Sequence, residues 1–193
     1  MLARLSGSVR NQFVRGYTGW RSVTSAAPRS SPIFRQLFDS ESCTYTYLLA
    51  DTNTKEAVLI DPVIEKAERD VQLVEDLGLS LKFVMNTHVH ADHITGTGRL
   101  KKLMPGCQSV ISEKSGGLAD ILVRDGDNIQ FGGHSLQVSE TPGHTEGCVT
   151  YIDTDMKVTW GGGSGYLVFG TLGLFGVVEF RYHLTRFKIQ IKN

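Results

Sequence analysis

The chain has little cysteine and no net charge. Among its 193 residues, the cysteines are Cys43, Cys107 and Cys148, an odd number without paired spacing. This predicts no disulfide framework and fits a reducing compartment. For Cys148, a buried structural thiol is favoured over a metal ligand or a sulfur carrier. The charges of the 20 basic and 20 acidic residues cancel. The chain therefore lacks the excess of positive charge that would indicate a nucleic-acid partner.

Acidic residues and lysine are absent from the first 38 residues, which hold six arginines and several serines. Apolar residues recur there every three or four positions, at Leu2, Leu5, Val9 and Phe13. The pattern predicts an amphipathic mitochondrial transit peptide over residues 1–32, and therefore a protein of the mitochondrial matrix. The alternative is a disordered basic arm that binds an acidic partner. The rest of the chain carries fourteen basic against twenty acidic residues, which also argues against a nucleic-acid surface.

Long apolar runs are missing as well. The uncharged run from Gly161 to Val178 is rich in glycine and falls short of the roughly 20 apolar residues that a membrane-spanning helix needs. No membrane span is expected. We expect residues 161–193 to form a divergent, poorly packed Gly-rich tail, and the alternative is a divergent strand pair.

The central part of the chain has alternating strand and helix patterns. Strand patterns occupy residues 34–38, 44–50, 57–60, 81–86, 108–112, 134–140, 149–153 and 156–160. Helical spacing of apolar residues covers Glu65–Leu77, with Gly78 as a stop signal, and a second helix is expected at Gly98–Met104. This order predicts one layered α/β domain over residues 33–160.

The segment Thr-His-Val-His-Ala-Asp-His at residues 87–93 is the densest cluster of metal-binding residue types. His88, His90 and His93 offer imidazole nitrogens and Asp92 offers a carboxylate, the donors that suit zinc and non-haem iron. The cluster directly follows a predicted buried strand, so a rigid element would hold it. It could serve one metal or two. The alternative is a surface loop that happens to be rich in histidine.

A second histidine, His144, lies in the turn-rich segment Thr141–Cys148 between two predicted strands. Because Pro142 and Gly143 fix a sharp turn and His144 emerges at a strand end as His88 does, it is predicted to be a ligand from a second loop. The two loops should converge at one edge of the sheets. The isolated His134 and His183 are expected on the surface.

Together the motifs Thr-His-X-His-X-Asp-His and Pro-Gly-His-Thr resemble the metallo-β-lactamase fold superfamily. Within it, the segments at residues 42–49, 56–63, 91–96 and 105–112 are similar to the mitochondrial persulfide dioxygenases. The resemblance covers about residues 32–160. It implies a metallo-β-lactamase-like αββα sandwich that is incomplete at the C-terminus.

The resemblance also implies an enzyme with one Fe(2+) per chain, with zinc as the alternative metal, that oxidises glutathione persulfide with molecular oxygen to sulfite and glutathione. A homodimer is possible. His88 and His144 match the two histidine ligands of that family. His90, Asp92 and His93 match positions that hold a second metal in two-metal relatives such as glyoxalase II, and they would support the first ligands in a dioxygenase.

The third ligand of the family is an aspartate, and Gly163 stands at that position here. Glycine has no side-chain donor, so two neutral imidazoles remain and weak metal binding is expected. Two alternative functions follow. One is a glyoxalase II-like thiolester hydrolase in which two metals activate water, and the other is an inactive truncated isoform or binding module.

Overall fold

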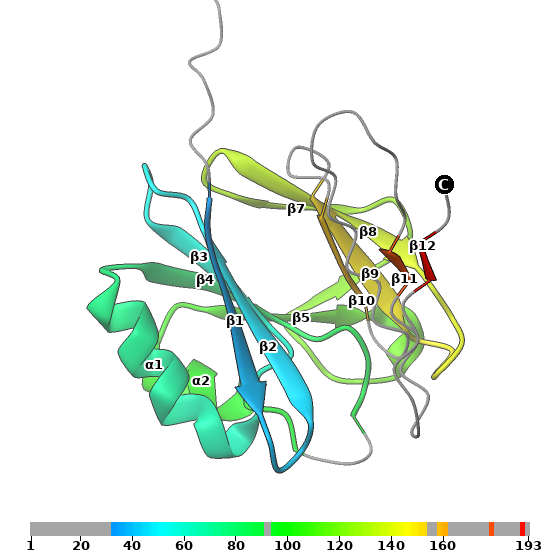
Figure 1. The fold of residues 1–193 in the computed structure, drawn as a ribbon, viewed down its shortest axis with the longest axis horizontal. Helices are drawn as coiled ribbons and strands as arrows, with labels where there is room; N and C mark the ends of the chain where they lie inside the picture. Colours follow the sequence, from blue (N-terminus) through cyan, green and yellow to red (C-terminus); the bar gives the residue numbers. More distant parts are fainter. Residues whose placement is uncertain (1–31, 91–93, 154–157, 162–177, 180–189, 192–193) are drawn as a thin grey trace, which may run out of the picture.

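The computed structural model describes residues 32–90, 94–153, 158–161, 178–179 and 190–191. These residues form an α/β fold in which two β-sheets pack face to face and two helices cover the outer face of the first sheet (Figure 1). The α/β fold class expected from the sequence is confirmed. Residues 1–31 and most of the expected Gly-rich tail lie outside the described residues, so the transit peptide and the tail stay predictions.

The first sheet has six strands in the order β1-β2-β3-β4-β5-β6. They are β1 (Ile33–Asp39), β2 (Thr44–Ala50), β3 (Glu56–Ile60), β4 (Ser80–Met85), β5 (Gln108–Ser112) and β6 (Ile121–Val123). The first three strands pair antiparallel, and β3 to β6 pair parallel. Parallel neighbours need a crossover, and helices supply it between β3 and β4 and between β4 and β5. The carboxyl ends of β3 and β4 therefore meet at one edge of the sheet.

The second sheet is antiparallel, in the order β10-β9-β8-β7. Its strands are β7 (Asn128–Phe131), β8 (His134–Glu140), β9 (Val149–Asp153) and β10 (Val158–Gly161). A separate short pair joins β11 (Val178–Glu179) to β12 (Gln190–Ile191). Strands β6 and β7 were not anticipated, because three or four residues are too few for an alternating pattern to stand out.

Two helices pack on the first sheet. Helix α1 (Ala67–Asp76) follows a single 3-10 turn, η1 (Ile64–Lys66), and α2 is Thr97–Leu103. The first expected helix is confirmed, although its first turn is the tighter 3-10 form. Gly78 follows α1 at φ +61°, a left-handed conformation that glycine adopts without strain, and its N–H donates to the Glu75 carbonyl. Neither helix of the described part combines the length and apolar character needed to cross a membrane.

Alternation along the strands divides the core into two apolar layers. The layer between the sheets is made of Leu49, Val58, Ile60, Phe83, Met85, Val110, Val123, Ile129, Phe131, Leu136, Val138, Val149, Tyr151 and Trp160. The layer under the helices is made of Leu48, Ala50, Ala57, Leu59, Ala67, Val74, Leu81, Val84, Leu100 and Cys107. Because successive strand residues point to opposite faces, β2, β3 and β4 contribute to both layers and are rigid supports for the loops that follow them.

The expected surface position of His134 is wrong. His134 is buried, and its ring lies 5.5 Å from the Phe131 ring, its register partner across the β7–β8 hairpin. It begins β8 on the face that also carries Leu136 and Val138, so strand alternation turns it toward the core. His183 lies outside the described residues.

Asp70, a buried carboxyl group on α1, leads to a pH prediction. Burial raises its pKa from 3.8 to about 6, against the opposing hydrogen bond and charge of Arg69. The folded chain thus holds the proton more tightly than the unfolded chain. The resulting contribution to the free energy of unfolding is fully present below the unfolded-state pKa and is lost as pH rises toward about 6.

Asp70→Asn should therefore remove this pH dependence and raise the free energy of unfolding at pH 7 by about 1–3 kcal/mol relative to the parent. Urea unfolding of both proteins at several pH values between about 4 and 7 measures the difference. A stability difference that does not change with pH would contradict the assignment.

Candidate metal centre

The two histidine loops meet at one end of the sandwich. The first loop leaves β4 at Asn86, and the second, residues 141–148, joins β8 to β9. The backbone N–H of Val149, the first residue of β9, donates to the Thr87 carbonyl over 2.9 Å. This bond ties the end of the second loop to the start of the first, so the expected convergence of the two loops is confirmed.

Three imidazoles lie side by side at this junction. The ring centroid of His88 is 4.0 Å from that of His90 and 5.0 Å from that of His144, with His144 edge-on to His88. His88 is buried, whereas His144 is exposed. The structure thus brings together the two predicted iron ligands and His90. Asp92, His93 and Gly163, the other predicted site residues, lie outside the described residues.

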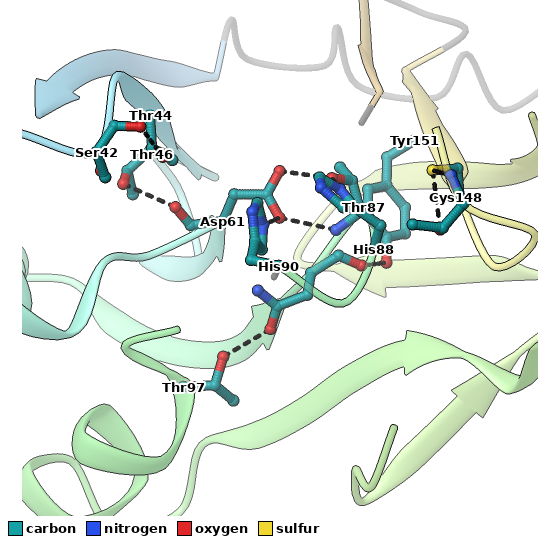
Figure 2. A network of polar contacts seen from close by, with 12 residues as sticks. Ser42, Thr44, Thr46, Asp61, Thr87, His88, His90, Thr97, Cys148 and Tyr151 are labelled. Carbon is teal, nitrogen blue, oxygen red and sulfur yellow. Dashed lines mark hydrogen bonds and ion pairs between the residues drawn. The ribbon is translucent and has the colours of Figure 1, made fainter. Parts of the chain in front are cut away.

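Asp61 holds this group together. It follows β3 and accepts three hydrogen bonds: from the Thr87 N–H at 2.8 Å, the Thr87 hydroxyl at 2.7 Å and His90 Nε2 at 3.2 Å (Figure 2). Its backbone has φ +50°, an uncommon value for a residue other than glycine. Bonds from its N–H to the Met85 carbonyl and from the Thr46 hydroxyl to its own carbonyl fix that conformation.

These bonds decide which imidazole nitrogens can bind a metal. The Thr87 hydroxyl donates its single proton to Asp61, so toward His88 Nδ1, 2.9 Å away, it can act as an acceptor alone. Neutral His88 then carries its proton on Nδ1 and its lone pair on Nε2. In the same way, Nε2 of His90 donates to Asp61 and its Nδ1 carries the lone pair. Asp61 therefore sets both tautomers, as outer residues do in metal sites.

The Asp61 carboxyl group is ionised despite its burial. Burial is the largest effect and would raise its pKa, but the hydrogen bond and electrostatic attraction of the His90 N–H and the two bonds from Thr87 outweigh it and lower the pKa. A buried carboxylate bonded to His90 and, through Thr87, to His88 supplies negative charge next to these imidazoles.

A second polar network supports the base of the first loop. The Asn86 carbonyl accepts the Tyr151 hydroxyl at 2.9 Å, and the Asn86 side-chain oxygen accepts the Thr97 hydroxyl at 2.7 Å (Figure 2). Burial, and less strongly the charge of Asp61, raise the pKa of Tyr151, so its hydroxyl keeps its proton and stays a donor. The residue before the histidine motif is thus held from both β9 and the start of α2.

Contacts with Cys148 hold the second loop in its conformation. Cys148 Sγ lies 3.2 Å from both the N–H and the hydroxyl of Thr145, and the Thr141 N–H donates to the Cys148 carbonyl over 2.9 Å. Cys148 is fully buried, so its expected burial is confirmed, and its structural role stays a prediction.

Sequence reasoning did not single out Asp61, Thr87 and Tyr151. A usable signal existed for Asp61: it directly follows strand β3, just as the histidine motif follows the adjacent parallel strand β4. Polar residues placed directly after neighbouring parallel strands meet at the same sheet edge. The Tyr151 contact had no such signal, because it depends on how the second sheet docks on the first.

The site supplies part of a metal-binding set. His88, with its tautomer set by Asp61 through Thr87, and His144 beside it offer the imidazole nitrogens that iron or zinc uses. Within the described ranges, however, no three His, Cys, Asp or Glu side chains form a group arranged to hold a metal ion. The residues present therefore fit the imidazole part of a two-histidine, one-carboxylate site.

The two-sheet fold and its histidine loops define a class of protein. The family model of the metallo-β-lactamase superfamily matches residues 43–160, more than half of the chain. The chain therefore belongs to the metallo-β-lactamase superfamily, as its motifs had indicated. The match ends at Trp160, three positions before Gly163.

Within the superfamily, the chain is similar to persulfide dioxygenases. It is 52% identical over 144 residues to the mitochondrial persulfide dioxygenase ETHE1 of Mus musculus, covering 75% of this chain and 57% of that protein. Identity to the Bos taurus protein of the same name is 57% over 130 residues, covering 67% and 51%. The crystal structure of ETHE1 from Myxococcus xanthus superposes with a TM-score of 0.61 at 50% identity, covering 64% of this chain and 54% of that one.

The chain thus spans between half and three fifths of the length of these curated relatives. Proteins named hydroxyacylglutathione hydrolase are more distant, at 34% identity over 110 residues for the one from Crocosphaera subtropica.

Proposed function

We propose that this chain is an iron-dependent persulfide dioxygenase domain that oxidises glutathione persulfide to sulfite and glutathione. The observation that carries the proposal is sequence identity: more than half of the aligned residues are identical to those of proteins named persulfide dioxygenases. Sulfite has three oxygen atoms, of which molecular oxygen supplies two and water the third. The names of those relatives also support a mitochondrial location, for which we propose the matrix, and a homodimer remains part of the proposal.

In this proposal, His88 and His144 hold one ferrous ion. Bound iron would supply open coordination positions for oxygen and for the terminal sulfur of the persulfide. The role of the chain itself is orientation: the Thr87 hydroxyl fixes the His88 ring, Asp61 holds His90 beside it, and the bond between Val149 and Thr87 keeps the two loops together. His90, Asp92 and His93 would support the ligands.

A metal-dependent thiolester hydrolase is the second candidate. It is favoured by the similarity to hydroxyacylglutathione hydrolases and by the donors of residues 87–93, which could hold a second ion that activates water. The two candidates differ in metal number and in oxygen consumption, so one set of assays separates them.

The first test is metal content and turnover of anaerobically purified full chain loaded with ferrous iron. About one iron per chain, with oxygen uptake that depends on glutathione persulfide, is the expected result. Two zinc ions per chain with hydrolysis of hydroxyacylglutathione would support the hydrolase. Absence of bound metal and of both activities would support an inactive isoform or a binding module.

Gly163→Asp tests the missing ligand position. A carboxylate there should complete a two-histidine, one-carboxylate set and tighten ferrous iron binding by at least about tenfold, which equals ~1.4 kcal/mol. The matched control is Gly162→Asp, which adds the same charge one residue earlier. Anaerobic iron titration of both variants measures the effect. Equal affinities would contradict the assignment of position 163, which lies outside the described residues.

A further inference from the structure

The Glu113–Gly117 turn touches both histidine loops. It contains the single 3-10 turn η2 (Glu113–Ser115), followed by Gly116 and Gly117. Position 117 faces the first loop, since a Cβ there would lie 3.3 Å from a Val89 methyl carbon. Position 115 faces the second loop, where Gly147 lies against its backbone. The turn thus contacts both of the loops that carry His88 and His144.

The contact between Gly147 and Ser115 is backbone against backbone. A Cβ at position 147 would come within 2.5 Å of the Ser115 nitrogen and closer still to its Cα. Backbone atoms cannot rotate away as a side-chain end can, so Gly147 is where the second loop rests on the turn. Residues 141–144 and 146 are exposed, whereas Gly147 and Cys148 are buried. Gly147 and Cys148 therefore anchor the exposed part of the loop that carries His144.

Internal hydrogen bonds hold the turn in its conformation. The Ser115 hydroxyl donates to the Ser112 carbonyl at 2.6 Å and accepts the Gly117 N–H at 3.1 Å, while the Lys114 N–H donates to the Ser112 hydroxyl at 3.2 Å. Gly116 completes the turn in the left-handed region at φ +67°. The side chain of Lys114 reaches out of the turn and forms an ion pair with Glu140 at the end of β8. The second loop begins at the next residue.

We propose that the Glu113–Gly117 turn positions the metal site, because the Ser115–Gly147 contact sets the separation between the His88 and His144 rings. Ser115 and Gly147 are positioning residues and bind no metal themselves. This inference rests on the proposed function only in the measurement of iron binding, because the separation of the two rings is a property of the metal-free chain.

The test is NMR of the metal-free full chain. The parent should show an NOE between Hα protons of Ser115 and Gly147, and one between ring protons of His88 and His144, whose centroids are 5.0 Å apart. Gly147→Ala should lose or strongly weaken the ring NOE and weaken ferrous iron binding by about 10–100-fold. The matched control, Gly143→Ala, places a methyl group in open space in the same loop and should keep the ring NOE.

A parent without the Ser115–Gly147 NOE, or a Gly147→Ala protein with an unchanged ring NOE, would overturn the proposal. If Gly147→Ala does not fold, one glycine inserted after Gly116, where a Cβ would meet no atom within 4 Å, lengthens the turn without added bulk. An unchanged ring NOE in that variant would equally overturn it. If the NOE pattern is as expected but the parent binds no iron, the proposed function fails and this inference stands.

Discussion

Asp61→Asn should reverse the tautomer of His88. The amide can still accept the Thr87 N–H through its oxygen, but its NH₂ group then faces the Thr87 hydroxyl as a donor. The hydroxyl must turn its proton toward His88 Nδ1, so neutral His88 carries its own proton on Nε2. Metal binding through Nε2 is lost, and iron affinity should fall about 10–100-fold. Nitrogen-15 shifts of the imidazoles report the tautomer directly.

Stability should fall as well, because the buried carboxylate that accepts three hydrogen bonds is replaced. We expect a loss of about 2–4 kcal/mol in the free energy of unfolding. Asp120→Asn is the matched control. Asp120 also accepts a backbone N–H and a hydroxyl from one residue, Ser109, but at the start of β5, away from the carboxyl ends of β3 and β4. If the control changes the His88 tautomer too, the effect is not specific to Asp61.

Gly132→Ala should separate the two sheets at the other end of the sandwich. The N–H groups of Gly132 and Gly133 donate to carboxylates of the first sheet, Glu56 and Asp51, both at 2.6 Å. A Cβ on Gly132 would clash with the Asp51 carboxylate and with the Thr54 hydroxyl, and its φ of +55° is strained for alanine. Asp51 cannot swing away, because the Asn53 N–H also holds it.

We expect Gly132→Ala to lower the free energy of unfolding by about 3–5 kcal/mol, since it adds backbone strain and disturbs two hydrogen bonds to charged groups. Gly126→Ala separates the two causes. Gly126 has φ +82° and open space around its Cβ position, so strain alone should cost about 1 kcal/mol. Urea unfolding compares the two variants, and equal losses would show that the clash with Asp51 and Thr54 adds nothing to the cost of backbone strain.

Local patterns were enough to predict much of the fold. Strands such as Thr44–Ala50 and Gln108–Ser112 were predicted with their observed bounds, because period-two alternation and turn residues are properties of a few consecutive positions. The buried face of α1 was predicted in a similar way, from apolar residues that recur at helical spacing. Strands β6 and β7 were missed because three or four residues give too little pattern.

For the candidate site, the sequence by itself determined which residue types are available and that His88 and His144 each follow a strand. It also showed that a glycine stands at position 163. These conclusions need only chemistry and short-range order along the chain.

The tertiary structure alone decided how these residues work together. The bond from Val149 to Thr87, the three bonds on Asp61 and the packing of Gly147 on Ser115 join segments that are 26 to 62 positions apart. Such contacts depend on how the two sheets dock and on which loops then lie side by side. Local patterns describe only neighbouring positions of the sequence, so they do not predict contacts between segments this far apart.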